Sequence, residues 1–237
     1  MKAMILAAGL GTRFKPWTDK HPKALAVING KSLLQRNIEY LQKADIFDVV
    51  VNVHHFADQI EDAVHLNKGW GSNIIISDER DVVLETGGGL VKAAANLVDD
   101  TFVLMNVDIL TRLDLKEMIN SHRKLMPLAT LATTGRKTSR YFLFDHLDNL
   151  CGWVSVKTGE EKIIRTTADR HQKAFSGIHV IEPRLFSLIK QEGKFSMVDV
   201  YLSLAAGEII KSYDHSDTPF IDVGKPEAVA EAEKLFK

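Results

Sequence analysis

The strongest constraint on the fold of this chain is a set of short apolar runs that contain no polar alternation. A strand with one solvated face alternates apolar and polar residues, whereas a strand buried on both faces is apolar throughout, as in a parallel sheet. The runs lie at Ala3–Leu6, Phe47–Val53, Asn73–Ser77, Thr101–Val107 and Leu128–Thr133. They predict strands that helices cover on both faces.

Helical patterns separate these runs as far as about residue 126. Ser32 and Gln35 form a capping-box signal at the start of the first pattern. The apolar stripes are Leu34, Ile38 and Leu41; Phe56, Ile60 and Val64; and Leu90, Ala93, Ala94 and Leu97. Strand and helix therefore alternate, which predicts βαβ units with right-handed crossovers. The expected fold class is α/β, Rossmann-like, with a mixed and mainly parallel sheet flanked by helices.

The pattern becomes looser after residue 126. Short strands with polar turns between them are expected at Tyr141–Phe144, Gly152–Val156 and Lys162–Arg165, which indicates a small antiparallel insertion. The further elements expected are a strand at Ala174–Ile181, a helix opened by Pro183 and a final helix over Pro226–Phe236. No proline- or serine-rich linker and no internal repeat interrupts the chain. Residues 1–237 are therefore expected to form one domain.

Composition excludes several classes of protein. A formal charge of −1 and a pI near 6.8 give no basic footprint, so a nucleic-acid partner is not expected. Cys151 is the one cysteine, which excludes an internal disulfide framework. The first apolar run is too short for a signal peptide or a membrane span. We expect a cytoplasmic protein, without a membrane partner, that is a monomer or a small homo-oligomer.

A glycine turn follows the first apolar run, in the segment MILAAGLGTRFKPWTDKHPKAL. A strand that runs into Gly9 and Gly11 leaves backbone N–H groups unblocked, and such groups can surround phosphate oxygens. Arg13 and Lys23 follow within the same segment. An isolated glycine turn is also compatible with a plain strand-to-loop connection.

Three familiar phosphate-binding loops do not fit this turn. The dinucleotide fingerprint GxGxxG fails because Phe14 stands where the third glycine is needed. A Walker A loop ending in Gly30, Lys31 and Ser32 would need a glycine at Leu25. A protein-kinase glycine loop would need further signature segments, and the chain has none of them.

The same segment, read as LAAGLGTRF.P.T...PKAL, resembles the signature of the sugar-1-phosphate nucleotidyltransferases. Four later segments agree with that family in order. They are LETGGGL (Leu84–Leu90), NVDIL (Asn106–Leu110), FSGIHV (Phe175–Val180) and FIDVGKPEAVAEAE (Phe220–Glu233). The resemblance covers almost the whole chain. It implies a nucleotide-binding part over about residues 1–126 and a sugar-binding part over about residues 127–237.

By this resemblance the protein would join an NTP to a sugar 1-phosphate, giving an NDP-sugar and pyrophosphate. Arg13 would hold the leaving pyrophosphate and Lys23 the α-phosphate, since substitution at phosphorus needs spread positive charge more than covalent chemistry. The nucleotide-binding residues implied are Leu6, Ala7, Ala8, Gly9, Gly11, Thr12, Arg13, Lys23, Glu85, Thr86 and Gly87. Three consecutive glycines, Gly87–Gly89, further suggest close approach of the backbone to a ligand.

Two aspartates stand where the family carries its metal ligands. Asp108 and Asp222 each follow an apolar run. A single aspartate at a strand end is usually a helix cap or a turn residue, but two at matching positions favour a metal site. Magnesium commonly takes one or two carboxylates together with substrate phosphates and waters. The resemblance therefore implies Mg²⁺ as cofactor.

The acceptor side is less distinct. The segments LETGGG, FSGI and WVSVKTGE resemble most closely the family members that use UTP and N-acetylmuramic acid 1-phosphate in bacterial cell-wall recycling. By the same resemblance, Ser176 and Gly177 would bind the sugar. The segment RKTSR offers Arg136 or Arg140 to the lactyl carboxylate of such an acceptor. An exposed turn explains RKTSR equally well.

Three other functions stay open. NVD replaces the NGD that is frequent in the family, and DVGK replaces DVGT, which leaves a mannose-1-phosphate guanylyltransferase as the alternative enzyme. A non-catalytic sensor on the same fold is disfavoured because the arginine, the lysine and both aspartates are present. An NAD-dependent dehydrogenase is disfavoured by Phe14.

Overall fold

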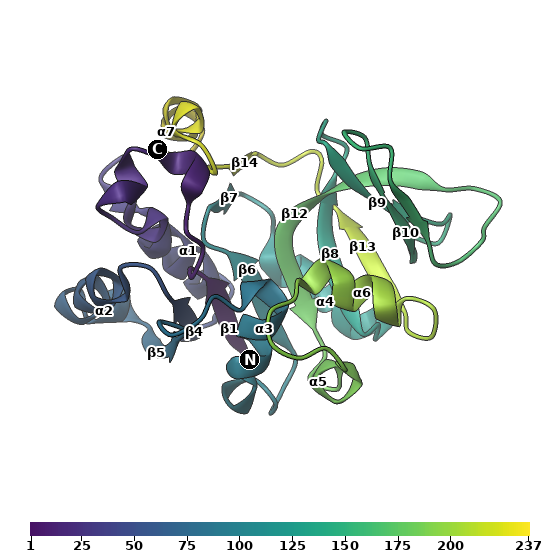
Figure 1. Cartoon of the computed structure of the whole chain (residues 1–237), viewed down its shortest axis with the longest axis horizontal. Coiled ribbons are helices and arrows are strands. Elements are labelled where there is room, and N and C mark those ends of the chain that lie inside the picture. The colour runs from purple at the N-terminus through teal and green to yellow at the C-terminus, as the bar shows by residue number, and fades with distance from the viewer.

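A ten-stranded sheet runs through the molecule (Figure 1). The structure is a computed structural model that describes every residue from Met1 to Lys237. The strands are β1 (Lys2–Leu6), β2 (Val27–Ile28), β3 (Lys31–Ser32), β4 (Asp48–Val53), β5 (Asn73–Asp78), β6 (Phe102–Asn106), β7 (Ile109–Thr111), β8 (Ala129–Thr134), β9 (Arg140–Phe144), β10 (Leu150–Ser155), β11 (Glu161–Ile163), β12 (His171–Ile181), β13 (Ile210–Asp214) and β14 (Phe220–Asp222). The pairs β2–β3 and β7–β14 form two separate small sheets.

Helices pack against this sheet in both halves of the molecule. They are α1 (Leu33–Gln42), α2 (Ala57–Leu66), α3 (Glu85–Lys92), α4 (Leu115–Leu125), α5 (Leu185–Leu188), α6 (Met197–Leu204) and α7 (Val229–Leu235). Ser32 is confirmed as the N-cap of α1, since its side chain accepts a hydrogen bond from the Gln35 N–H, but the Gln35 side chain donates to Glu39 and does not complete a capping box.

The first half is the expected parallel arrangement. β1 pairs in parallel with β4 and with β6, and β4 pairs in parallel with β5. Ala3 and Ile5 pack in one large apolar cluster, whereas Met4, between them, packs in a second cluster on the other face. Because both faces of β1 are buried, its sequence shows no polar alternation. The predicted βαβ order is confirmed in this half.

β12 joins the two halves of the molecule. Its first residues pair with β9 and its last residues with β6, while β8 lies along its other edge. β8 is fully buried, as its apolar run predicts, but it is antiparallel to β12 and parallel only to β13. The strands β9, β10 and β11 form the expected antiparallel insertion.

Some elements differ from the sequence prediction. The helix expected after Pro183 is only the four-residue α5. The final helix begins with a 3₁₀ turn over Pro226–Ala228 and continues as α7. This last segment returns to the first half, where Ala232 and Phe236 share an apolar cluster with Phe14.

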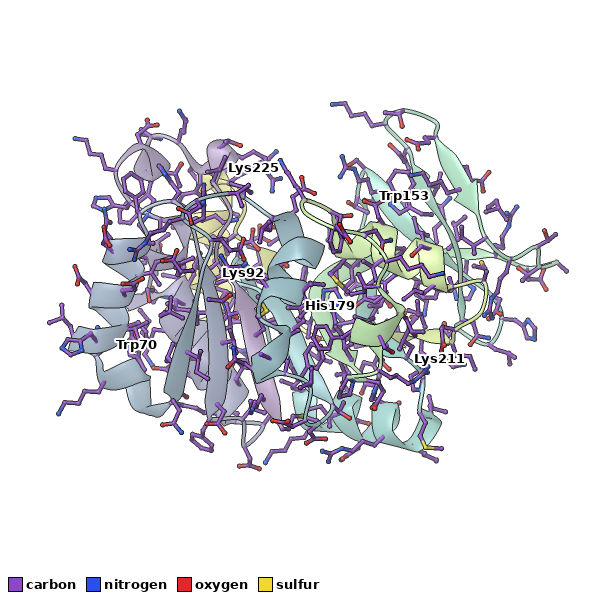
Figure 2. The ribbon with its side chains drawn as sticks, turned by 60° about the horizontal axis from the view of Figure 1, so that its bottom comes forward. Trp70, Lys92, Trp153, His179, Lys211 and Lys225 are labelled. Carbon is purple, nitrogen blue, oxygen red and sulfur yellow. The ribbon has the colours of Figure 1, made fainter.

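No helix is long and apolar enough to cross a lipid bilayer. In Figure 2, Trp70 and Trp153 lie at opposite ends of the molecule, so they form no common stacking surface.

Candidate active site

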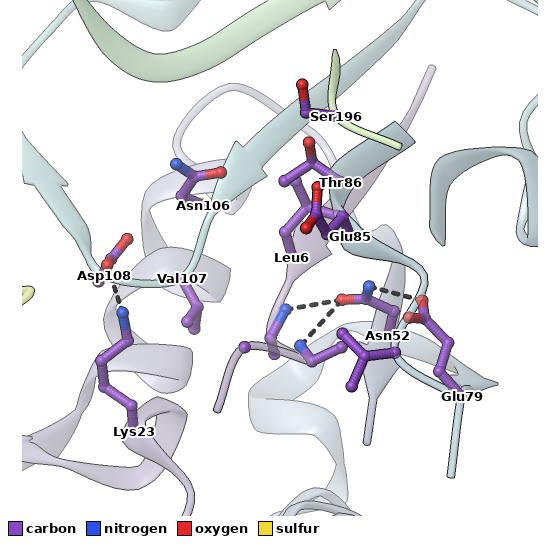
Figure 3. Close-up of a pocket in the computed structure, with 14 residues that line it drawn as sticks. Leu6, Lys23, Asn52, Glu79, Glu85, Thr86, Asn106, Val107, Asp108 and Ser196 are labelled. Atoms are coloured by element: carbon purple, nitrogen blue, oxygen red, sulfur yellow. Dashed lines mark hydrogen bonds and ion pairs between the residues drawn. The ribbon is translucent and has the colours of Figure 1, made fainter. Parts of the chain in front are cut away.

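A cavity of about 340 Å³ lies at the carboxyl ends of β1, β4 and β6 (Figure 3). In open α/β sheets ligands bind at this edge, where the strand order reverses. Here the chain passes from β1 to β4 and β5 and then returns to place β6 on the other side of β1. The cavity is lined by Leu6, Ala7, Ala8, Gly9, Lys23, Asn52, Glu79, Val83, Glu85, Thr86, Asn106, Val107, Asp108 and Ser196.

The two glycines of the turn have different physical roles. Gly11 has a φ of 61°, and a Cβ placed there would lie 2.8 Å from Thr18 Cγ2. Its carbonyl accepts a hydrogen bond of 2.9 Å from the Thr18 hydroxyl. The fold of the loop therefore already requires glycine at this position. A Cβ at Gly9 would meet nothing within 4 Å, so only there does the missing side chain leave space open at the cavity.

Asn52 orders the start of this turn, and sequence analysis did not identify it. Its Oδ1 accepts hydrogen bonds from the backbone N–H groups of Ala7, at 2.7 Å, and Ala8, at 3.3 Å. Its Nδ2 donates to Glu79 Oε1 at 2.7 Å. Both side chains are buried, and burial raises the pKa of the Glu79 carboxyl. A single amide in the otherwise apolar run of β4 was the available signal.

The Gly87–Gly89 segment begins α3 and is packed against the protein itself. A Cβ at Gly87 would lie 2.4 Å from Phe195, one at Gly88 would lie 2.2 Å from the Gly193 carbonyl oxygen, and one at Gly89 would lie 2.6 Å from Glu79 Oε1. All three glycines are buried. Packing within the protein therefore already requires glycine at these three positions, and the approach of a ligand to this segment stays a prediction.

The two residues before these glycines do line the cavity. The Thr86 hydroxyl accepts a hydrogen bond of 2.9 Å from the Met197 N–H, which links α3 to the first turn of α6. Glu85 has a φ of 59°, in the left-handed region that residues with side chains seldom occupy. Strained backbone of this kind is concentrated at ligand sites.

Lys23 and Asp108 pair with each other on one side of the cavity. Lys23 begins a short 3₁₀ turn (Lys23–Leu25), and Asp108 lies between β6 and β7. Their side chains form an ion pair and are only 14% and 13% exposed. Figure 3 shows this pair on the side of the cavity opposite to Asn52 and Glu79. The structure thus brings together two residues that are 85 positions apart in the sequence.

Asp222 lies beside this pair because β14 runs along β7. Asp222 is opposite Ile109 in the register, and the Val223 N–H donates a hydrogen bond of 2.8 Å to the Asp108 carbonyl. The Asp222 side chain is exposed at the edge of the site. Its pKa is nevertheless raised, first because the surrounding protein partly excludes water and secondly because the Asp108 carboxylate is near. Two carboxylates that repel each other in this way favour a cation between them.

Arg13 comes to Asp222 from the other side. A Cβ at Gly224 would lie 2.7 Å from Asp222 Oδ1 and 3.0 Å from Arg13 Nη2, so both side chains lie against this glycine. Arg13 and Asp222 line a second cavity, of about 300 Å³, with residues near the start of α7. Gly11, Thr12, Arg13, Gly87 and Asp222 are not among the residues that line the larger cavity.

The sequence-predicted sugar residues take three different positions. Ser176 is buried, and its hydroxyl lies 2.8 Å from His215 Nε2. Gly177 has a φ of 75°, and a Cβ there would lie 2.8 Å from Asn106 Nδ2, a side chain that lines the cavity. Arg140 is exposed at the start of β9. Arg136 is half-buried instead, with its guanidinium 5.1 Å from the centre of the Phe220 ring.

Comparison with known proteins agrees with this geometry. The family model described as nucleotidyl transferase matches residues 2–236. The N-acetylmuramate alpha-1-phosphate uridylyltransferase of Caulobacter vibrioides is 32% identical over 86% of this chain and 84% of its own. The mannose-1-phosphate guanyltransferase of Yarrowia lipolytica is 30% identical over 95% of this chain and 61% of its own.

Among solved structures, HddC from Yersinia pseudotuberculosis, complexed with GMP-PN, has a TM-score of 0.78. It is 25% identical and covers 100% of this chain and 99% of its own. A full-length match to the family model is thus joined by relatives that share most of the chain. The chain belongs to the nucleotidyl transferase family and is an enzyme of the sugar-1-phosphate nucleotidyltransferase type.

Proposed function

We propose that this enzyme transfers UMP from UTP to N-acetylmuramic acid 1-phosphate in the presence of Mg²⁺ and releases pyrophosphate. One observation carries the proposal. Arg13, Lys23, Asp108 and Asp222 come from separate parts of the sequence and adjoin one another beside the cavity. The choice of substrates within the family is supported by the similarity to the Caulobacter uridylyltransferase over most of both chains.

The reaction is a direct substitution at the α-phosphorus of the nucleotide. A phosphate oxygen of the acceptor forms the new P–O bond, and the bond to the bridging oxygen of the β-phosphate breaks with its electron pair leaving on pyrophosphate. Lys23 stabilises negative charge on the α-phosphate, and Arg13 stabilises the charge that develops on pyrophosphate. Backbone N–H groups near Gly9 hold the remaining phosphate oxygens.

Asp108 and Asp222 fit a magnesium ion by the chemistry of their donor atoms. Both offer hard carboxylate oxygens, and burial and secondly the Asp108 carboxylate raise the pKa of Asp222, so that a cation bound there would stabilise its charged form. A bound Mg²⁺ would supply charge stabilisation to the phosphate oxygens of both substrates. Gly177 leaves room for the Asn106 side chain, and Ser176 forms a hydrogen bond with His215. Both residues therefore position other side chains of this side of the site.

Pyrophosphate release tests the proposal directly. The four common NTPs are each combined with the 1-phosphates of N-acetylmuramic acid, N-acetylglucosamine, glucose and mannose, with Mg²⁺ or with excess EDTA. We expect the highest kcat/KM for UTP with N-acetylmuramic acid 1-phosphate, and no turnover in EDTA. Faster release from GTP and mannose 1-phosphate would overturn the proposed substrates and favour the guanylyl reaction of the Yarrowia relative.

A further inference from the structure

Arg136 is a half-buried cation that forms no direct ion pair, although the Asp222 carboxylate is near enough to act on its charge. It follows β8, and its Nη2 donates one hydrogen bond of 2.9 Å to the Phe175 carbonyl. Its Nε is buried and has no hydrogen-bond acceptor, and Nη1 donates no hydrogen bond within the protein. The only further contact of the charge is with the face of the Phe220 ring. Two of the three guanidinium nitrogens are therefore left without an acceptor.

This arrangement costs free energy in the isolated protein. A guanidinium that loses water without gaining a carboxylate or a full set of acceptors is held against its solvation preference. Burial accordingly lowers the pKa of Arg136, and Asp222 opposes that change. A charge kept in such a place is compensated when an anion binds to it.

The position of Arg136 indicates which anion this is. Phe220 lies in β14, two residues before Asp222, and Phe175 lies in β12, two residues before Gly177. Arg136 is therefore attached to the two strands that bound the acceptor side of the site. The phosphate side, at Gly9 and Lys23, is formed by other elements.

We propose that Arg136 binds an oxyanion of the acceptor substrate. The inference rests on the proposed function, because it assumes that a sugar 1-phosphate enters this side. The oxyanion is either the 1-phosphate, which every acceptor carries, or a carboxylate elsewhere on the sugar, as in the lactyl group of N-acetylmuramic acid. A planar guanidinium can hold either group through two parallel hydrogen bonds, which a lysine cannot reproduce.

Arg140 is the competing residue from the same basic segment. It is the first residue of β9, and its exposed side chain forms no hydrogen bond or ion pair within the protein. A long exposed side chain with full hydration gains little from one more charge partner. Arg136 differs from Arg140 and from the exposed Lys137 beside it because its unpaired nitrogen is buried and cannot be hydrated instead.

The test compares steady-state kinetics of Arg136→Gln and Arg136→Lys with those of Arg140→Gln and the charge control Lys137→Gln. The acceptors are N-acetylmuramic acid 1-phosphate and N-acetylglucosamine 1-phosphate, at saturating UTP. Loss of a charge-assisted hydrogen bond predicts that Arg136→Gln raises the acceptor KM about 10- to 100-fold. The KM for UTP and the thermal unfolding midpoint are expected to stay near those of the wild type. Arg136→Lys is expected to recover only part of the loss.

The pattern across acceptors identifies the oxyanion. An equal rise in KM for both acceptors assigns Arg136 to the 1-phosphate, and a rise confined to the muramic acid substrate assigns it to the carboxylate. The inference is overturned if Arg136→Gln folds normally and leaves both acceptor KM values unchanged, or if Arg140→Gln alone raises them. An enzyme that uses neither acceptor contradicts the proposed substrates first, and the same variants are then compared on its preferred sugar 1-phosphate.

Discussion

The side of the site that we propose for the nucleotide and the side that we propose for the acceptor, called below the nucleotide side and the acceptor side, are built in different ways. The nucleotide side is mainly backbone: the Ala7–Gly9 turn is held by Asn52, which in turn is held by Glu79. The acceptor side is formed by side chains whose partners come from other strands, such as Ser176 with His215 and Arg136 with Phe220. A backbone site demands particular small residues in one short segment, whereas a side-chain site draws on residues far apart in the sequence.

This difference affects how much a sequence motif indicates about a binding site. The Gly9–Gly11 turn can be recognised in the sequence because only glycine allows the backbone path at Gly11 and leaves the open space at Gly9. The glycines at Gly87–Gly89 look similar in sequence, yet they serve contacts with Phe195, Gly193 and Glu79. The following predictions, from the largest expected effect to the smallest, test whether the two sides really act separately.

The largest effect is expected where the two sides meet. Asp108→Asn and Asp222→Asn should each lower kcat by about 1000-fold, since metal-bound charge stabilisation contributes several kcal/mol. Asp222→Asn should unfold at or above the wild-type temperature, because it relieves the repulsion by Asp108, whereas Asp108→Asn should unfold at a lower temperature, because Lys23 loses its ion-pair partner. Pyrophosphate release and thermal unfolding measure these effects. Asp62→Asn, an exposed site on α2, is the control. Near-wild-type turnover in either active-site variant would remove that aspartate from the metal site.

Arg13→Ala is expected to lower kcat by about 100-fold, the usual cost of losing one donor to a developing negative charge. The KM for UTP should change less, because Arg13 is assigned to the leaving pyrophosphate and not to ground-state binding. The neighbouring exposed residue Lys15, which pairs with Asp19, provides the control Lys15→Ala. A raised nucleotide KM with unchanged kcat would show that Arg13 only binds the ground state.

Asn52→Ala should raise the KM for UTP about 10-fold, because two backbone N–H groups of the turn lose their acceptor. The KM for the sugar 1-phosphate should not change if the nucleotide side and the acceptor side are independent. Glu79→Gln keeps an acceptor for the Asn52 amide and is expected to cost less. Equal changes in both KM values for Asn52→Ala would mean that the turn also shapes the acceptor side, and the comparison above would fail.

The smallest effect concerns stability at acid pH on the acceptor side. Burial lowers the pKa of His215 to about 4; Asp214 partly opposes this, and Arg136 adds a smaller lowering. The contribution of His215 to the free energy of unfolding is complete above a pH of about 6.5, the pKa of histidine in the unfolded chain. It is lost as the pH falls toward 4, because over this range the unfolded state binds a proton that the folded state does not. We expect a loss of about 2 kcal/mol between pH 7 and pH 5.

Denaturant unfolding at a series of pH values measures this loss. His215→Gln should lower stability at pH 7 but reduce the pH dependence, whereas His65→Gln, an exposed control on α2, should change neither. A pH dependence that is identical in His215→Gln and the wild type would assign the acid sensitivity elsewhere. The buried His179, whose pKa burial lowers to about 3, would then be the next residue to replace.

Much of the first half could be predicted from periodicity alone. The strands β1, β4, β5 and β6 and the capped start of α1 lie within a residue or two of the expected ranges. Errors gathered in the second half. The helix after Pro183 has only four residues. The prediction that β8 is a parallel strand is wrong for its pairing with β12, which is antiparallel. The short strands β7 and β14 were not expected. Strands of three residues carry too few positions for a period to be visible.

The sequence by itself determined the α/β class, the glycine turn and the set of charged residues that we propose for the chemistry. Each depends on a local requirement: an apolar run for a strand buried on both faces, a glycine for a left-handed turn, a cation beside a phosphate. Only the tertiary structure decided which of these residues meet. β14 brings Asp222 to Asp108, Asn52 holds the turn from a neighbouring strand, and Arg136 is buried where Arg140 is exposed. Strand register and burial are properties of the packed sheet, and no short segment encodes them alone.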